Sequence, residues 1–366
     1  MPRRTASMLA SLLLLIAVLC AAVLIEVPYA AMSPGPTYNT LGKVDGEQVL
    51  SFPGKEDAGN KATGNLNMTT VRVTGSEYRM NLFEAVYGWL AHDSAVVPRS
   101  TLYPEDKSAR QVEEENAEEF SRSQESAKVA ALRELKKKVT TRIVVQSVVK
   151  GGAAQGKLHA GDVIKAVDGK PVDNPQEVGD LVTKHEVGER VDFTIVPAQK
   201  AAAAEKAKKD PLTLEGKQIS VPTKKSPDDG RPVIGIASGT AHTLPFRIDI
   251  TLADVGGPSA GLMFALGIVD KLTPEDLTGG TFVAGTGTIE ADGEVGAIGG
   301  IRMKTVAARE KGAEFFLTPK DNCATAAADK PAGLTLVEVD TMHDATSALK
   351  KIRNGETGDL ARCSTG

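Results

Sequence analysis

A serine and a lysine stand in two glycine-rich stretches in the last third of the chain. Ser259 lies in Gly-Gly-Pro-Ser-Ala-Gly at 256–261, and Lys304 ends Gly-Gly-Ile-Arg-Met-Lys at 299–304. A serine hydroxyl is a weak nucleophile until a base takes its proton, and a neutral lysine amine can be that base. Small residues beside the serine let a substrate carbonyl approach the hydroxyl and the N–H groups of the turn. The two stretches indicate nucleophilic acyl chemistry.

This chemistry makes a demand on the lysine. Its pKa must fall by about three units from a reference near 10.4, on the order of 4 kcal/mol, which only burial or cationic neighbours supply. Because the sequence cannot show such burial, purely structural roles for the serine and the lysine stay open. Ser259 is also a typical helix N-cap, and Lys304 shares its helix with Arg302, Arg309 and Lys311, as an ordinary solvated lysine does.

Two other functions stay open. Gly257, Ser259 and Gly261 also fit the Gly-x-Ser-x-Gly turn of an α/β-hydrolase esterase, and Asp340 and His343 follow in the order that such a triad requires. No His-Gly-Gly-Gly element precedes the serine, which argues against this alternative. The other alternative is a scaffold protein whose hydrolase-like domain is inactive. The intact serine and lysine argue against it.

Composition limits the classes of function. The 366 residues are 41% hydrophobic and 4% aromatic, with a net charge of -4. This length predicts two or three domains, and the charge and few aromatic residues argue against nucleic-acid binding. The sequence contains no Gly-x4-Gly-Lys-Ser/Thr loop for a nucleotide and no Cys-x-x-Cys or His-Glu-x-x-His metal motif. We expect no cofactor and no metal.

The first residues form a membrane signal. Arg3 and Arg4 precede a run of 18 residues at 8–25 that a single serine interrupts, which is about the minimum to span a bilayer. Two arginines before the run predict that the N-terminus is inside and the remainder extracytoplasmic. This assigns 1–27 to a cytoplasmic tip and a transmembrane signal anchor. A cleaved signal peptide is the alternative, because Ala30 and Ala31 offer a cleavage site.

Cysteine usage agrees with export without requiring it. Cys20 lies inside the apolar run, and Cys323 and Cys363 can pair in an oxidising compartment. Their spacing alone does not demand a disulfide.

Residues 28–140 are expected to form an extracytoplasmic stalk and helical region. Ser-Pro-Gly-Pro at 33–36 predicts an extended stalk, since prolines stiffen the chain and block a helix. Alternation at 66–73 predicts a strand, and 81–91 a short helix with an asparagine N-cap. The charged stretch 105–138 has acids first and bases last, which favours a long helix. We interpret that helix as a spacer or coiled-coil arm.

A third region, 141–225, contains Ala-Gly-Asp-Val-Ile at 160–164 and a tight Val-Asp-Gly-Lys-Pro-Val hairpin at 167–172. These runs resemble a PDZ domain, which implies a β-sandwich-like fold with two helices and a groove that accepts a peptide as an added strand. The alanine- and lysine-rich 198–215 is predicted to be an inserted surface loop. No Gly-Leu-Gly-Phe-like loop precedes Ile143, so the resemblance does not extend to capture of a free C-terminus. The strands expected here are 143–149, 190–196 and 218–221, and the expected helix is 174–184.

The last domain is assigned to 231–353, followed by a tail at 354–366. Its strands and helices alternate, which predicts an α/β arrangement, so the whole chain is expected to be an α+β multidomain protein. The expected strands are 233–236, 247–252, 281–286, 314–317 and 334–339, with a hairpin through Asp292-Gly293. The expected helices are 260–271, 301–311 and 343–352.

This domain resembles the proteolytic domain of Lon-type Ser-Lys peptidases, which carry Gly-Pro-Ser-Ala-Gly and a later Gly-Gly-x-x-x-Lys. Thr286-Gly287, 18 residues before Lys304, also matches the family's Thr-Gly. The resemblance implies that Ser259 is the nucleophile, that Lys304 is the general base and that the Thr286 hydroxyl holds the lysine. The amides around Ser259 would form the oxyanion hole, with Gly257, Pro258 and Ala260 as supporting residues.

The order of anchor, PDZ and Lon-like regions resembles the membrane-anchored PDZ-Lon proteases of Gram-positive bacteria, for which the run 32–37 is also typical. The resemblance implies an ATP-independent endopeptidase acting on proteins or peptides, with no nucleotide or nucleic-acid partner, and is compatible with a homo-oligomer. Two features depart from Lon itself. The ATPase domain is absent, and Gly256 occupies the position of an acid, with Asp254 two residues before it.

Overall fold

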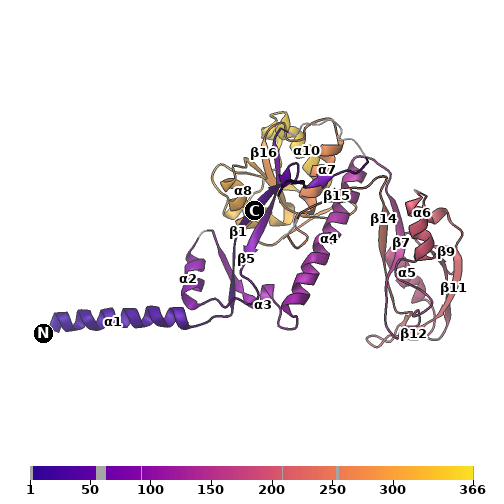
Figure 1. The fold of residues 1–366 in the computed structure, drawn as a ribbon, viewed down its shortest axis with the longest axis horizontal. Helices are drawn as coiled ribbons and strands as arrows, with labels where there is room; N and C mark the ends of the chain where they lie inside the picture. The colour runs from indigo at the N-terminus through magenta and orange to yellow at the C-terminus, as the bar shows by residue number, and fades with distance from the viewer. Residues whose placement is uncertain (1–2, 55–62, 92, 208, 253–254, 366) are drawn as a thin grey trace. The chain divides into compact units, whose positions relative to one another are not determined.

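The computed structural model describes residues 3–54, 63–91, 93–207, 209–252 and 255–365. It divides into two compact units (Figure 1). The first unit joins Met1–Lys137 to Phe246–Gly366, and the second is the intervening Lys138–Pro245. The second unit is therefore an insertion within the sequence of the first.

The first unit is built on a six-stranded mixed sheet in the order β20-β19-β16-β5-β1-β6. Strands β5, β16, β19 and β20 run parallel to one another, whereas β1 is antiparallel to both β5 and β6. Three strands thus come from the N-terminal part of the chain and three from the C-terminal part. Their bounds are β1 Tyr29–Asn39, β5 Asn65–Val73, β6 Ala95–Pro98, β16 Phe282–Gly285, β19 Phe315–Pro319 and β20 Thr335–Val339.

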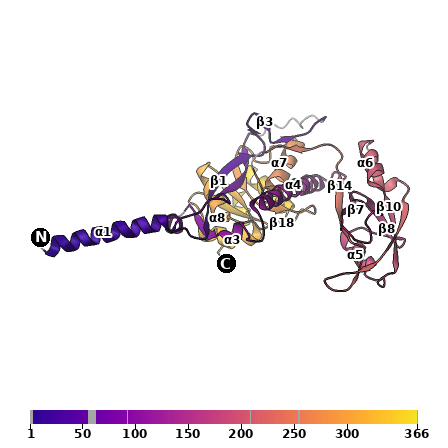
Figure 2. The ribbon, with the colours of Figure 1, turned by 60° about the horizontal axis from the view of Figure 1, so that its bottom comes forward.

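Two groups of helices cover this sheet. Helix α8 packs on β1, β5 and β16 and contacts α9, while α4, α7 and α10 contact one another. Figure 1 shows α8 on one side of the strands and α4, α7 and α10 on the other. Helix α4 lies beside α7 in both views (Figures 1 and 2). The bounds are α4 Ala109–Glu134, α7 Gly261–Leu272, α8 Ile301–Glu310, α9 Cys323–Ala328 and α10 Met342–Arg353.

The N-terminal region differs from the expected stalk. Residues 33–36 form part of β1, and the register between β1 and β5 shifts between Pro34 and Thr37. Prolines cannot donate to a ladder, so a strand accepts them at such an irregularity. The prediction that prolines prevent a helix at 33–36 is confirmed. The segment is extended as predicted, but it pairs with β5 and is therefore a strand rather than a free stalk. The predicted separation of 28–140 from 231–353 is therefore not seen.

Helix α4 is also not a free spacer. Its second half buries an apolar side made of Phe120, Ala127, Val129, Ala130, Ala131 and Leu132. The Phe120 ring meets the Phe264 ring of α7 edge to face at 5.9 Å. The charge pattern describes the solvated side of the helix, and the buried side packs against α7 of the first unit.

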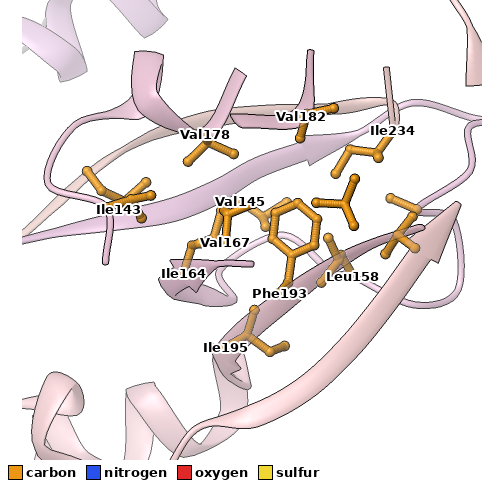
Figure 3. Packing of buried hydrophobic residues seen from close by; sticks show 14 residues of the cluster. Ile143, Val145, Leu158, Ile164, Val167, Val178, Val182, Phe193, Ile195 and Ile234 are labelled. Carbon is orange, nitrogen blue, oxygen red and sulfur yellow. The ribbon is translucent and has the colours of Figure 1, made fainter. Parts of the chain in front are cut away.

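The second unit is an antiparallel sheet in the order β11-β10-β8-β7-β14, with β9 paired to β8. Helix α5 packs on β8 and β14. Figure 3 shows the Phe193 ring at the centre of the core, with Val178 and Val182 of α5 on one side of it. The bounds are β7 Thr140–Val148, β8 Val163–Val167, β9 Lys170–Pro171, α5 Pro175–Val182, β10 Arg190–Val196, β11 Lys217–Pro222 and β14 Ile236–Thr243.

The predicted hairpin of this unit is confirmed, whereas the predicted loop at 198–215 is not. The hairpin joining β8 to β9 has positive φ at Asp168 and Gly169, as a type I′ turn requires. The segment expected as a loop at 198–215 instead forms helix α6, Ala198–Lys206, and a 3₁₀ turn, Pro211–Thr213. Its alanines have high helix propensity, and Ala201 and Ala204 are buried. Strand β14 belongs to this unit, so the last domain resumes at Phe246 rather than at 231.

The remaining features are two N-terminal helices, a disulfide and several short elements in both units. Helix α1, Arg3–Leu24, contains one stretch, 7–24, that is long and apolar enough to cross a membrane. Helix α2, Leu82–Leu90, has Asn81 as its N-cap, as predicted. A disulfide joins Cys323 to Cys363 and holds the C-terminal tail beside β20. The short elements are α3 Arg99–Leu102, β2 Lys43–Val44, β3 Glu47–Gln48, β4 Leu50–Ser51, β12 Lys224–Lys225, β13 Pro232–Val233, β15 Asp249–Ile250, β17 Thr288–Ile289 and β18 Val295–Gly296.

Candidate active site

Ser259 lies on the turn that leads into α7. Gly257, two residues before it, has φ +79, a left-handed conformation that favours glycine. The N-cap residue of α7 is Ala260, and no side chain caps the helix. The Ser259 hydroxyl therefore has no capping role and is left for another partner.

That partner is Lys304. Its Nζ lies 2.7 Å from Ser259 Oγ and 3.0 Å from Thr286 Oγ1. Lys304 projects from the first turn of α8, which begins after Gly300 at φ +71. A Cβ at Gly300 would lie 2.8 Å from Val71 Cγ1, so a glycine is needed for α8 to start this close to β5. The fold brings the three predicted residues together.

Lys304 is one of the largest fully buried side chains of the described part, with 2% of its surface exposed. Burial lowers its pKa from 10.5 to about 7, because the charged form loses its hydration. No carboxylate lies within ion-pair distance of it among the described residues. The amine is therefore largely neutral near or just above neutral pH, as a general base must be.

Thr286 and Gly287 hold the backbone of Ser259. The Thr286 hydroxyl donates to the Ser259 carbonyl at 3.0 Å, and the Gly287 N–H donates to the same oxygen at 3.0 Å. The Thr286 hydroxyl accepts from Lys304 as well, so it links the lysine to the serine backbone. This threonine is fully buried, and its two contacts fix the relative positions of β16, α7 and α8 at the site.

Only part of the predicted oxyanion hole is available. The Gly257 N–H donates to the Asn116 carbonyl at 3.0 Å, and Pro258 has no N–H. The N–H groups of Ser259 and Ala260 have no hydrogen-bond partner among the described residues. These two unpaired donors stand at the N-terminal end of α7, where the helix dipole favours negative charge.

Helix α4 supports the turn, which the sequence did not reveal. The Ser123 hydroxyl donates to the Pro258 carbonyl at 2.8 Å, and the Asn116 carbonyl accepts from Gly257. Ser123 is buried, and a Cβ on Gly261 would come within 2.6 Å of its Oγ. Serine in a charged helix carries no distinctive signal, so only the fold identifies this contact.

A pocket of about 310 Å³ opens onto the two reactive groups. Strands β1 and β5 supply most of its wall, although the sequence analysis assigned them no place near the site. Half-buried Ser259 faces it beside Lys304, so a substrate in the pocket can reach the hydroxyl. The lining residues are Pro36, Tyr38, Met68, Thr70, Val71, Arg72, Val255, Gly256, Ser259 and Lys304.

The esterase triad is not formed. His343 lies on α10 with 79% of its side chain exposed, and its Nδ1 is 3.2 Å from Glu134 Oε1. Asp340 pairs with Lys320 at 2.7 Å. The strand before Ser259, β15, pairs with β4 outside the main sheet, whereas a nucleophile elbow follows a strand of that sheet. Asp254, considered as a substitute for the acid of Lon, lies outside the described residues.

A second candidate site lies in the inserted unit, between α5 and the edge strand β14. A groove of about 550 Å³ runs along these elements. Val178 and Val182 of α5 line it together with Ile234 and Ile236. Strand β14 is the last strand of its sheet, so one backbone edge of it is open to an added strand.

The segment 226–235, which connects β12 to β14 and contains β13, also lines this groove. The N–H groups of Ile234 and Gly235 have no hydrogen-bond partner among the described residues, while their carbonyls accept from Ala154 and Val149. Gly235 has φ +76. Unpaired amides at the end of an open strand edge are the usual means of holding a peptide carboxylate. The sequence predicts a carboxylate-binding loop only before Ile143, where no Gly-Leu-Gly-Phe-like run occurs. The segment 226–235 instead lies between β11 and β14, near the C-terminal end of the unit.

Two family models match the chain, one from α4 into the inserted unit and the other within the C-terminal part of the first unit. Residues 116–204 match the family model of the PDZ domain, and residues 253–349 match that of the Lon protease (S16) C-terminal proteolytic domain. A curated relative, the mitochondrial Lon protease homolog of Eremothecium gossypii, is 41% identical over 68 residues. That match covers 19% of this chain and only 6% of the relative.

Solved structures of PDZ domains are similar to part of the chain. The PDZ domain of the SdrC-like protein of Listeria monocytogenes is 25% identical and covers 26% of this chain and 86% of its own, with a TM-score of 0.21. Its counterpart from Listeria innocua is 26% identical and covers 28% and 99%, with a TM-score of 0.22. The family matches and the two described sites agree: the chain carries a PDZ domain and a C-terminal proteolytic domain of the Lon (S16) type.

Proposed function

We propose that this protein is a membrane-anchored serine endopeptidase that cleaves protein substrates through a Ser259–Lys304 dyad. The observation that carries the proposal is a buried lysine amine, 2.7 Å from a serine hydroxyl, whose pKa lies near neutrality. A solvated lysine would be charged and would not accept a proton.

Catalysis would proceed through an acyl-enzyme. The neutral Lys304 amine takes the Ser259 proton as the oxygen attacks the scissile carbonyl, and the free N–H groups of Ser259 and Ala260 receive the developing oxyanion. The Lys304 ammonium then protonates the leaving amine. Water next attacks the ester carbonyl, with Lys304 again as base, and Ser259 recovers its proton. Thr286 holds the lysine throughout.

Three variants of the full chain in detergent test this proposal, with casein as an unstructured substrate. Ser259→Ala and Lys304→Met are expected to lower the hydrolysis rate by about 10⁴-fold or more, because neither half of such a unit works alone. Lys311→Met is the matched control, since Lys311 is exposed just beyond the last turn of the same helix. Retained hydrolysis in Ser259→Ala contradicts the dyad.

The groove between α5 and β14 would bind substrate or partner proteins by their C-termini. An added strand pairs with β14, a terminal apolar side chain contacts the four aliphatic residues of the groove, and the carboxylate meets the Ile234 and Gly235 amides. Peptides that end in valine are expected to bind, and their C-terminal amides are expected to bind at least tenfold more weakly, because one charge-assisted contact is lost. Equal affinity for both forms would contradict carboxylate capture.

Location follows from two features. Helix α1 would span the membrane, and the arginines before it favour an N-terminus inside. The Cys323–Cys363 disulfide supports an oxidising compartment for the remainder of the chain. Protease added outside intact cells should therefore digest the two folded units.

A further inference from the structure

Helix α2 turns its apolar side outward. Phe83, Val86, Tyr87 and Leu90 stand at positions i, i+3, i+4 and i+7, and 50%, 42%, 68% and 76% of their surfaces are exposed. Trp89, at the edge of this stripe, is 53% exposed, and its ring meets the Tyr29 ring of β1 edge to face with the centroids 5.3 Å apart. On a helix of a water-soluble domain, a stripe with this spacing faces the core. Here it faces away from the core, and these five residues are called the outer face of α2.

The opposite side of α2 is fixed in place. Its buried residues are the small Ala85 and Gly88. A Cβ on Gly88 would lie 2.6 Å from Val96 Cγ2 of β6, and the Ser94 hydroxyl donates to the Gly88 carbonyl at 2.7 Å. A capping box made by Asn81 and Glu84 fixes the first turn. Close packing by small residues therefore holds the outer face outward.

The start of α2 is tied to the end of α1. The Leu82 N–H donates to the Ile25 carbonyl at 2.9 Å, and the Val27 N–H donates to the Met80 carbonyl at 2.9 Å. Helix α1, the candidate membrane span, ends one residue before Ile25. Helix α2 therefore begins where the span leaves the hydrocarbon.

We propose that the outer face of α2 lies in the interfacial layer of the bilayer that α1 crosses. Aromatic side chains with a polar atom, such as Tyr87 and Trp89, favour this layer, while Phe83 and Leu90 reach toward the acyl chains. A short helix with one apolar side binds in this way when it lies in the membrane plane. The proposal rests on the membrane anchoring proposed above. The ligand is a lipid surface rather than a protein, because the backbone bonds to Ile25 and Val27 keep α2 at the end of the span.

The single tryptophan of the chain makes the test direct, since all of the indole emission comes from Trp89 of α2. The full chain is reconstituted in vesicles of phosphatidylcholine and phosphatidylglycerol, with or without bromine on the upper part of the acyl chains. Flotation with the vesicles is measured first. Bromine is then expected to quench most of the Trp89 emission, whereas iodide in the water is expected to quench little of it.

Each other result overturns a distinct statement. A chain that does not float refutes the anchor and the interfacial helix with it. A chain that floats, with Trp89 quenched by iodide but not by bromine, places the outer face in water and refutes only the helix proposal. Quenching by neither agent means that a protein surface, such as a second copy of the chain, covers the face, and also refutes it.

A variant pair strengthens the test. Phe83→Ser combined with Leu90→Ser removes exposed apolar area without touching the packed side, so bromine quenching of Trp89 is expected to fall while flotation persists through α1. Val187→Ser is the matched control, because Val187 is 52% exposed in the second unit. Unchanged bromine quenching in the double variant would overturn the role assigned to the outer face.

Discussion

At the scale of single residues, the site depends on keeping one amine uncharged. Lys304 has its pKa lowered to about 7 by burial, whereas the unfolded chain restores it to about 10.5. Below pH 7 both states hold the proton, and folding then bears the full cost of burying the charge. Between the two values the unfolded state holds more protons, so folding stability rises with pH through this window. The catalytic requirement therefore costs stability under acidic conditions.

The same pKa predicts the dependence of peptidase activity on pH. Only the neutral amine accepts the Ser259 proton, so kcat/KM should rise about tenfold per pH unit below about 7 and level off above it. Initial rates on a fluorogenic peptide between pH 5 and 9 measure this. Thr286→Val should move the midpoint to lower pH, since the hydroxyl that accepts from the ammonium is gone. A midpoint that stays above pH 9 in the native chain would contradict the proposed base.

At the scale of elements, the nucleophile turn is held from outside by α4. Ser123→Ala removes the hydrogen bond to the Pro258 carbonyl, which should cost about 1 kcal/mol of stability and lower kcat several-fold. KM should change little, because Ser123 is not among the residues that line the pocket.

The neighbouring exposed Ser121 offers the matched control. Ser121→Ala makes the same chemical change on the solvated side of α4 and should leave both constants unaltered. An equal loss of kcat in the two variants would mean that the helix, rather than the contact to the turn, responds to the substitution.

Element boundaries were largely predictable because local patterns determine them. The asparagine before α2, the Asp-Gly hairpin at β8–β9 and the apolar run of α7 each gave a correct element. Contacts between residues far apart in the sequence were predictable only where both residues belong to specific motifs. Ser259, Thr286 and Lys304 were assigned through the resemblance of their motifs to those of Lon-type peptidases, whereas Ser123 belongs to no such motif.

Long-range pairing explains the remaining errors. The residues of β1 do not indicate that this strand pairs with β5. Those of β5 do not indicate that it also pairs with β16, which lies more than 200 residues later. The loop near Gly235, which we propose to hold a carboxylate, was not predicted for the same reason, because the order of strands in a sheet is not their order in sequence. Burial of Lys304 depends on these pairings, and no periodicity in α8 reveals it.

At the scale of the whole molecule, the disulfide fixes the C-terminal tail to the first unit. Cys323 and Cys363 are 40 residues apart, and closing a loop of that size in the unfolded chain stabilises the fold by about 4 kcal/mol in the chain-entropy description. Cys323→Ser with Cys363→Ser should therefore lower the melting temperature measured by circular dichroism. Addition of a reductant to the native chain should reproduce the change and have no effect on the double variant.

The division of the first unit has a consequence for biosynthesis. Its N-terminal strands leave the ribosome first, yet β16, one of the two neighbours of β5, is more than 200 residues away, and Lys304 comes later still. A nascent chain therefore carries an unpaired β5 edge until β16 has emerged. The inserted unit, Lys138–Pro245, lengthens this interval, and in the proposed mechanism the chain has no base until Lys304 has been synthesised.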